Sequence, residues 1–242
     1  MNPKICISFD VEEFDLPLEY GIQISKEEQM EIGFRGLKAI QPILDIPGLR
    51  CTLFTTANFA DHFPNEIKAL SDKHEIASHT YYHSSFETRD LLSSRLRLEE
   101  ITGKPVTGLR MPRMMDVPVE DILAAGYSYD SSIHPTWIPG RYNNFHLPRT
   151  EYLEKGLKRI PASVSPLFRI PLFWLAFKNF PLWFYELIAK WTFHTDGTLM
   201  LYFHPWEFTD ISKFGLPKYI TKGCEGRNLE KLLRALRGLP TY

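Results

Sequence analysis

The chain has 242 residues, of which 44% are hydrophobic and 24% charged, and its formal net charge is −1. This length is sufficient for one large domain with a full hydrophobic core, and the composition is not that of a disordered chain. A net charge so close to zero gives no general attraction to nucleic acid, so we expect no nucleic-acid partner.

The N-terminal half alternates predicted strands with predicted helices. Strands are expected at 4–9, 51–56 and 75–78. A capping box that begins at Ser25 starts a helical region whose apolar spacing continues to Ile43. Asn58 opens the next helical stretch, which Pro64 interrupts.

The C-terminal half continues this alternation. Helices are expected at 88–101, 117–125 and 228–236. Strands are expected at 106–110 and 199–204. Gly103 and Gly126 are placed to end the first two helices, and Asn228 is expected to cap the third.

The alternation of strands and helices predicts an α/β fold. Such an order is typical of parallel strands joined by helical crossovers. We predict a distorted (β/α) barrel with seven or so strands, formed by a single domain that covers residues 1–242. In such barrels the active site is built at the carboxyl ends of the strands.

An aromatic-rich insertion is expected at about 161–196. Its Phe, Trp and Tyr residues crowd the tract Leu167–Phe193, where charged residues and two prolines make a membrane-spanning helix unsuitable. One interpretation is that the rings pack on the barrel. The alternatives are a groove for a sugar or acyl chain, or a patch that gives the protein peripheral contact with a membrane surface.

Cysteine content and the N-terminus bear on the cellular location. The chain has three cysteines, Cys6, Cys51 and Cys224. Because their number is odd and small and no Cys-x-x-Cys pair occurs, we expect no disulfide framework. No apolar signal core precedes the first predicted strand. We therefore expect a reducing, cytoplasmic location, with association at a membrane as the alternative.

Two histidines suggest a metal site. His79 and His83 are four residues apart, which is about one helical turn, so both imidazoles can point to the same side. Convergent imidazoles need only acidic ligands to complete such a site. An acidic segment at 10–13 and a late histidine, His204, also follow predicted strands. A barrel would bring these strand ends together, whereas each feature alone suits an ordinary surface position.

Five short motifs, in this order, resemble those of the polysaccharide deacetylases of the NodB-homology type, a class of carbohydrate esterases. They are Ser8-Phe9-Asp10-Val11-Glu12, His79-Thr80-Tyr81-Tyr82-His83, Gly108-Leu109-Arg110-Met111-Pro112, Tyr129-Asp130-Ser131-Ser132 and Leu201-Tyr202-Phe203-His204-Pro205. The resemblance runs from Ile5 to about Phe208. The segments Asp-Val-Glu and His-Pro-Trp-Glu-Phe resemble those of a subgroup linked to exopolysaccharide and surface-glycan assembly.

The resemblance implies a divalent metal, with zinc as the first choice, bound by His79, His83 and an acidic residue. In the commoner first motif the second of two adjacent Asp residues binds the metal, but Val11 occupies that position. Alternate residues of an extended segment share a side, so we place Glu12 as the acidic ligand and keep Glu13 as the alternative.

The resemblance also implies the proton carriers. Asp10 corresponds to the general base and His204 to the general acid. Arg110 would keep Asp10 ionised through a charge-assisted hydrogen bond, and Asp130 would do the same for protonated His204. The alternatives are a purely structural ion pair for Arg110 and a turn residue for Asp130.

The implied activity is metal-dependent hydrolysis of an N-acyl group, most often N-acetyl, from an amino sugar in a polysaccharide or glycan precursor. The expected location favours a lipid-linked or nucleotide-linked sugar precursor. Two alternatives remain: a small-molecule amidase of the same fold, and a non-catalytic glycan-binding module in which Val11 has spoiled the metal site.

Overall fold

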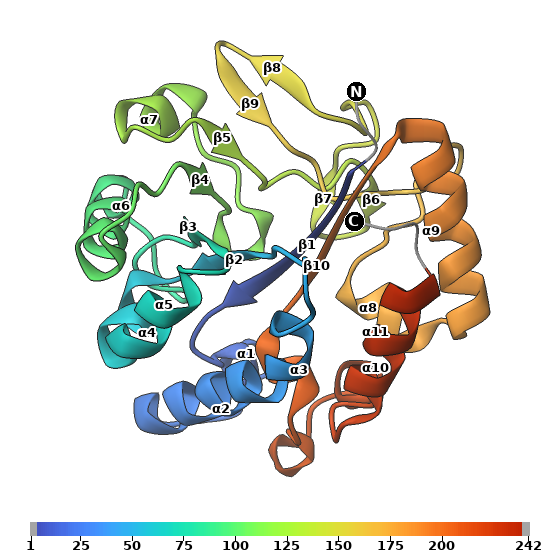
Figure 1. The fold of residues 1–242 in the computed structure, drawn as a ribbon, viewed down its shortest axis with the longest axis horizontal. Helices are drawn as coiled ribbons and strands as arrows, with labels where there is room; N and C mark the ends of the chain where they lie inside the picture. The colour runs from blue at the N-terminus through green and yellow to red at the C-terminus, as the bar shows by residue number, and fades with distance from the viewer. Residues whose placement is uncertain (1–3, 239–242) are drawn as a thin grey trace.

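The structure is a computed structural model that describes residues 4–238 (Figure 1). An eight-stranded sheet forms its centre, and its strands follow the order β10 (Thr198–Phe203), β1 (Lys4–Val11), β2 (Thr52–Thr55), β3 (Glu75–Ser78), β4 (Gly108–Leu109), β5 (Tyr129–Asp130), β9 (Leu157–Arg159) and β8 (Tyr152–Glu154). The first seven strands in this order are parallel, and β8 pairs antiparallel with β9.

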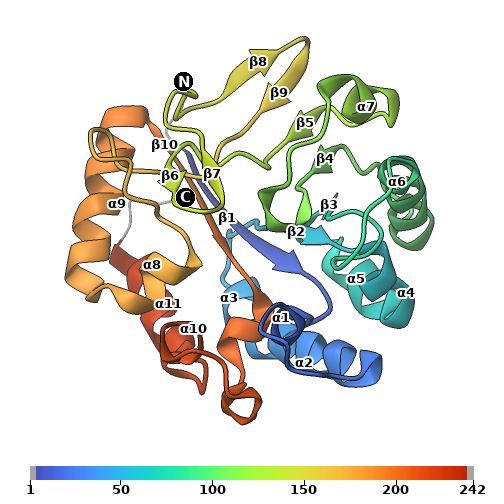
Figure 2. The same ribbon diagram turned by 180° about the vertical axis from the view of Figure 1, so that it is seen from behind.

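The helices lie around the outside of the curled sheet (Figures 1 and 2). They are α1 (Leu16–Glu19), α2 (Lys26–Ala39), α3 (Gln41–Leu44), α4 (Ala57–His62), α5 (Pro64–Leu70), α6 (Arg89–Thr102), α7 (Val119–Ala124), α8 (Trp174–Asn179), α9 (Leu182–Asp196), α10 (Lys218–Thr221) and α11 (Arg227–Gly238). Short 3₁₀ helices are η1 (Pro112–Met114), η2 (Pro205–Phe208) and η3 (Ser212–Phe214), and β6 (Trp137–Ile138) pairs with β7 (Tyr142–Asn143) as a separate ribbon. The α/β fold with an open, distorted barrel is therefore confirmed.

Several helix signals in the sequence act as expected. The Ser25 side chain accepts a hydrogen bond from the backbone N–H of Glu28 and so caps α2. Gly103 ends α6 in a left-handed conformation with φ of 70°. The expected role of Asn228 is wrong: it lies inside α11, where its side chain donates to the carbonyl oxygens of Glu207 and Lys222. Asn228 thus joins two segments instead of capping a helix.

Strand register aligns the carboxyl ends of the strands. Phe9 on β1 is level with Leu53 on β2 and with Phe203 on β10. Ser78 on β3 is level with Leu109 on β4. The residue that follows each strand therefore emerges at the same edge of the sheet, which is where a barrel gathers its functional groups.

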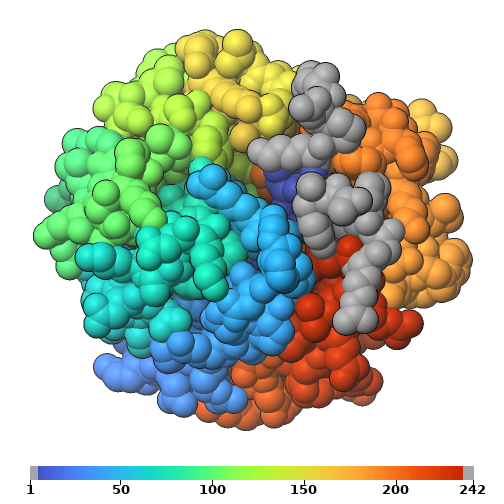
Figure 3. All heavy atoms as spheres, in the orientation of Figure 1, coloured from blue at the N-terminus to red at the C-terminus, as the bar shows by residue number. Residues whose placement is uncertain are grey.

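Both sides of the parallel strands are covered, as this architecture requires. One hydrophobic cluster joins β1, β2 and β10 to helices α2–α9 and α11, and a smaller cluster surrounds Phe14 and Trp206. In the space-filling view the surrounding helices are in contact, and the dark blue of β1 shows only as a small patch (Figure 3). Within residues 4–238, no helix has both the length and the apolar composition needed to cross a bilayer.

Helix α2 approaches η2 so closely that only glycine fits at Gly36. A Cβ atom added there would lie 2.4 Å from the carbonyl carbon of Pro205. This contact fixes η2, the segment that directly follows His204. The buried side of α2 therefore supports one wall of the candidate site.

We expect Gly36→Ala to lower the free energy of unfolding by about 1–3 kcal/mol, because overpacking outweighs the better helix propensity of alanine. Glu31→Ala, on an exposed position of the same helix, should change it by less than about 0.5 kcal/mol. Urea denaturation of both variants measures this difference. Equal midpoints for Gly36→Ala and the wild type would contradict the close packing of α2 on η2.

Candidate active site

Strand β1 brings acidic side chains to the carboxyl edge of the sheet. Ser8, Asp10 and Glu12 alternate with Phe9 and Val11, and both apolar residues lie in the hydrophobic core. Successive residues of an extended segment point to opposite sides, so the three polar residues share one side. Val11 is therefore a core residue, and Glu12 is the carboxylate that reaches the histidines.

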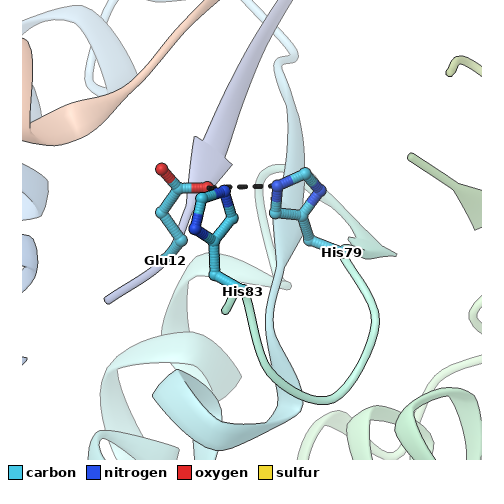
Figure 4. A group of neighbouring side chains, drawn as sticks. All are labelled: Glu12, His79 and His83. Carbon is cyan, nitrogen blue, oxygen red and sulfur yellow. Dashed lines mark ion pairs between the residues drawn. The ribbon is translucent and has the colours of Figure 1, made fainter. Parts of the chain in front are cut away.

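Glu12, His79 and His83 form a compact cluster in which the three side chains point toward one another (Figure 4). The Nε2 atoms of His79 and His83 lie 3.1 and 3.3 Å from Oε2 of Glu12. One ligand atom from each residue falls within 4.8 Å of the others. This spacing suits three ligands around one small cation.

The two histidines do not converge through a helix, contrary to the expectation from their spacing. His79 directly follows β3, and the segment up to His83 is irregular. Thr80 has a φ of 64°, a left-handed conformation that is unusual for a β-branched residue. This turn brings His83 back beside His79, so backbone geometry at Thr80 replaces the helical periodicity that the sequence suggested.

The outer nitrogen of each histidine is held by an acceptor. Nδ1 of His79 lies 2.7 Å from the carbonyl oxygen of Arg110, and Nδ1 of His83 lies 2.7 Å from Oδ1 of Asp15. A carbonyl or carboxylate oxygen can only accept, so each Nδ1 donates. Each Nε2 is then directed at Glu12, as in histidines that bind metals.

The Glu12 carboxylate is held in a similar way. Its Oε1 accepts a hydrogen bond of 3.1 Å from Nε1 of Trp206. Its buried Oε2 has no hydrogen-bond partner within residues 4–238. A buried carboxylate oxygen without a partner is costly unless a cation satisfies it. These three residues therefore fit a divalent metal, with Oε2 and two Nε2 atoms as its ligands.

The pKa values of Glu12 and His83 reflect the closeness of the charged groups in the cluster. Burial would raise the pKa of Glu12, but the charges of His83 and His204 hold that pKa well below its ordinary value. Burial would lower the pKa of His83, but Glu12 and Asp15 raise it to about 9. With no metal bound, the cluster would hold a proton at neutral pH, and a metal ion would displace it.

Glu13, the alternative ligand, is engaged elsewhere. Its Oε2 accepts from Oγ1 of Thr56 at 2.7 Å, and its Oε1 accepts from Nδ2 of Asn58 at 3.1 Å and from the backbone N–H of His83 at 3.0 Å. These bonds fix the loop that carries His83. Within the described residues the metal-type cluster contains Glu12 and not Glu13.

Arg110 lies at the centre of the site and is completely buried. Its Nη1 donates to Oδ1 of Asp10 at 2.7 Å and to Oγ of Ser8 at 2.9 Å. Its Nε and Nη2 donate to the backbone and side-chain oxygens of Ser131, and its guanidinium carbon lies 4.1 Å from the ring centre of Phe54. The arginine thus fixes the Asp10 carboxylate in one orientation.

His204 follows β10 and faces Asp10 across the cleft, with 3.9 Å between its Nε2 and Oδ2 of Asp10. Its Nδ1 lies 3.0 Å from Oε1 of Glu207. The second Glu207 oxygen lies 3.2 Å from Nζ of the buried Lys178. Burial would lower the pKa of His204, but the negative charges of Glu12, Glu207 and Asp10 raise it.

The expected contact of Asp130 with His204 is wrong. Oδ2 of Asp130 accepts from Nη1 of Arg159 at 2.6 Å, and its two oxygens also accept from the backbone N–H and hydroxyl of Ser132. Asp130 lies on β5, on the far side of Arg110 from β10 in the sheet order. The carboxylate that contacts Nδ1 of His204 is that of Glu207, only three residues along the chain.

Aromatic rings form the walls of a cleft of about 250 Å³ that Asp10, Glu12 and the three histidines line. Trp206 stacks on His204 with 4.9 Å between ring centres. Trp174 meets His204 edge-on at 5.2 Å, and Phe173 also lines the cleft. Part of the aromatic tract therefore belongs to the site.

The rest of the tract divides between the core and the surface. Phe177 is completely buried, whereas Trp183 is 68% exposed. Leu187 and Trp191 are exposed as well, and with Trp183 they are spaced four residues apart along α9. These three residues form an apolar ridge on α9, separate from the rings that line the cleft, whereas Leu167 and Phe168, each 71% exposed, precede α8.

Three contacts of the site were not anticipated from the sequence. Asp15 and Lys178 have no distinguishing spacing, and only the fold brings them to His83 and Glu207. Glu207 carried a usable signal, because it follows His204 by three residues. The Pro205 that begins η2 makes a helical turn at that point a reasonable expectation.

Comparison with known proteins finds a family resemblance over part of the chain and a shared fold. The family model described as polysaccharide deacetylase matches residues 35–115, while a search of curated proteins returned no relative. A protein from Mycobacterium smegmatis, named as a polysaccharide deacetylase, is 18% identical with a TM-score of 0.60, and the alignment covers 99% of this chain and 92% of that one.

Two further solved structures share the fold. One, from Pseudomonas aeruginosa PAO1 and also named as a polysaccharide deacetylase, is 14% identical with a TM-score of 0.62 and coverage of 98% and 85%. The other, PuuE allantoinase, is 15% identical with a TM-score of 0.60 and coverage of 97% and 83%. The match over residues 35–115 confirms the resemblance of this chain to the polysaccharide deacetylase family. The solved structures show that this chain shares its fold with proteins named as polysaccharide deacetylases.

Proposed function

We propose that this protein is a metal-dependent N-deacetylase that removes an acetyl group from an amino sugar of a glycan. The observation that carries the proposal is the convergence of the buried Oε2 of Glu12 with the Nε2 atoms of His79 and His83, since the described residues place only these two imidazoles against that oxygen. The family match supports a glycan substrate.

In this proposal Glu12, His79 and His83 hold one divalent ion, and zinc suits two imidazoles and a carboxylate. When bound, the ion would supply a Lewis acid that lowers the pKa of a water molecule and polarises the amide carbonyl. Asp15 and the Arg110 carbonyl keep both Nδ1 atoms protonated, which leaves each Nε2 free as a ligand.

Two residues are proposed to move protons. Asp10, oriented by its hydrogen bond from Arg110, accepts a proton from the attacking water as the new C–O bond forms at the amide carbon. His204, whose pKa is raised, gives its Nε2 proton to the nitrogen as the C–N bond breaks. The products are acetate and a free amino sugar; Asp10 then releases its proton to solvent and His204 takes up a proton from solvent, so both residues return to their starting states.

The aromatic walls are proposed to bind the sugar. Trp174 and Phe173 are half-buried rings on the cleft wall, and a pyranose ring can pack on such rings through its C–H groups. Glu207 keeps the His204 ring in place through Nδ1, and Lys178 neutralises the second oxygen of Glu207. The aromatic insertion thus supports both sugar binding and the general acid.

The first prediction separates the two candidate ligands on the acidic segment. Glu12→Gln should lose most bound metal, because it removes the only carboxylate in the cluster. Glu13→Gln should retain most of it, because Glu13 only fixes the loop. Metal content by plasma mass spectrometry, with His79→Ala as a second ligand variant, measures this. Full metal retention in Glu12→Gln would reject the site.

The second prediction separates ligands from proton carriers. Asp10→Asn and His204→Ala should each lower kcat by about 10²-fold or more while metal content stays near that of the wild type.

Release of acetate from N-acetylated sugars and from small amides should be followed in parallel. Turnover of small amides alone would favour an amidase, and glycan binding with neither metal nor turnover would favour a binding module.

The third prediction concerns pH. Because Glu207 helps to raise the pKa of His204, Glu207→Gln should lower that pKa. The protonated acid would then be lost at a lower pH, so the alkaline limb of kcat/KM should move to lower pH. The exposed Glu225→Gln serves as the matched control and should leave the profile unchanged. An unmoved alkaline limb in Glu207→Gln would exclude the proposed role of Glu207.

A further inference from the structure

His134 is a buried histidine that takes no part in the mechanism proposed above. It lies in the segment that follows β5, and its side chain is completely buried. Its ring stands behind three rings that line the cleft, with distances of 5.2, 6.1 and 6.2 Å between its ring centre and those of Phe173, Tyr202 and Tyr142. A polar ring in such a place needs a hydrogen bond to replace the water that it has lost.

That hydrogen bond joins His134 to Tyr142. Nδ1 of His134 lies 2.9 Å from the hydroxyl oxygen of Tyr142, whereas its buried Nε2 has no partner within residues 4–238. Burial, together with the charge of Arg110, lowers the pKa of His134 to about 3. The imidazole is therefore neutral at physiological pH and carries one proton, on either Nδ1 or Nε2.

The position of this proton decides the direction of the Tyr142 hydroxyl. With the proton on Nε2, a buried N–H would be left without an acceptor, whereas with the proton on Nδ1 only a lone pair is left unpaired. Buried N–H donors without an acceptor are rarer in proteins than buried acceptors without a donor. Nδ1 of His134 therefore donates to the Tyr142 oxygen, and the hydroxyl proton of Tyr142 is left for another acceptor.

The Tyr142 hydroxyl is available to a ligand. Tyr142 lies on β7, in the ribbon that also contributes Ile138 and Arg141 to the lining of the cleft. Among the residues that the structure describes, His134 is the hydrogen-bond partner of this hydroxyl. Burial raises the pKa of Tyr142 to about 12, so the hydroxyl keeps its proton at neutral pH.

Two other donors that line the cleft are already engaged within the protein. Nε1 of Trp206 donates to Glu12, and Nη2 of Arg113 donates to Asp15. An N-acetylated amino sugar carries acceptor oxygens on its hydroxyl groups and on its acetyl carbonyl, and each that loses water in the cleft needs a donor. The proton of Tyr142 meets this need.

We propose that the Tyr142 hydroxyl binds the substrate as a hydrogen-bond donor, aimed by His134 at an acceptor oxygen of the amino sugar. This inference rests on the proposed deacetylase function, to which it adds a specificity residue outside the five sequence motifs. His134 acts only through Tyr142 and is a positioning residue. A substrate without an oxygen at this place would leave the donor unpaired and would bind more weakly.

The test measures binding of the β-1,4-linked trimer of N-acetylglucosamine by calorimetry in the Asp10→Asn background, where turnover is slow. Tyr142→Phe keeps the ring and removes the donor, so Kd should rise about three- to tenfold. His134→Leu should cause a similar loss, because the hydroxyl is no longer held. His134→Asn should restore most of the affinity, since its amide N–H can replace the Nδ1–H of the histidine.

A double variant and a control sharpen the test. Tyr142→Phe combined with His134→Leu should weaken binding no further than Tyr142→Phe alone, because both changes remove the same hydrogen bond. Asn143→Ala is the matched control and should leave Kd unchanged, because Asn143 is the next residue on β7 and is exposed.

Acetate release by Tyr142→Phe in the otherwise wild-type protein identifies the acceptor. A rise in KM at constant kcat indicates a sugar hydroxyl, which is bound equally in the ground and transition states. A fall in kcat indicates the acetyl oxygen, whose negative charge grows in the transition state.

The outcomes separate this inference from the proposed function. Unchanged trimer binding in Tyr142→Phe, or no trimer binding in the parent, would overturn the inference. Equal losses in His134→Asn and His134→Leu, or losses that multiply in the double variant, would also overturn it, because His134 would then act through packing. Acetate release would still support the deacetylase in each of these cases. Trimer binding that depends on Tyr142 and His134 as expected, in a protein that releases no acetate, would keep the inference and reject the deacetylase.

Discussion

The buried guanidinium of Arg110 is the interaction on which the rest of the site depends. A fully buried cation is tolerated only when it is paired and hydrogen-bonded, and here Asp10, Ser8 and Ser131 satisfy its donors. The backbone carbonyl oxygen of Arg110 also accepts a hydrogen bond from Nδ1 of His79. One arginine therefore orients both the proposed base and one proposed metal ligand.

The opposite wall of the site depends on a second buried ion pair. Lys178 from α8 meets Glu207 from η2, and Glu207 in turn holds His204. The lysine also lies 4.8 Å from the ring centre of Trp174, which it helps to position. Residues from the aromatic tract Leu167–Phe193 thus contribute to the shape of the cleft and to the electrostatics around His204. Deleting this tract would remove the ion pair that holds Glu207 as well as hydrophobic packing.

Hydrophobic runs and glycine stops predicted the strand-to-helix alternation, because they are local signals, whereas the candidate site residues were assigned from the five motifs. Glu75–Ser78 was predicted with its observed bounds, and Glu12 was placed with the histidines because alternate residues of a strand share a side. The reason given for the convergence of the histidines was wrong, since a left-handed Thr80 cannot be read from spacing. Partners such as Asp15, Lys178 and Arg159 come from distant segments, and only the fold brings them into contact.

The most direct test of the account is a crystal structure of the zinc-loaded protein with an anomalous difference map recorded at the zinc edge. The account predicts one strong peak at about 2.0–2.2 Å from Oε2 of Glu12 and the Nε2 atoms of His79 and His83. A zinc peak bound by other residues, or a map without density among these three atoms at full zinc loading, would contradict it.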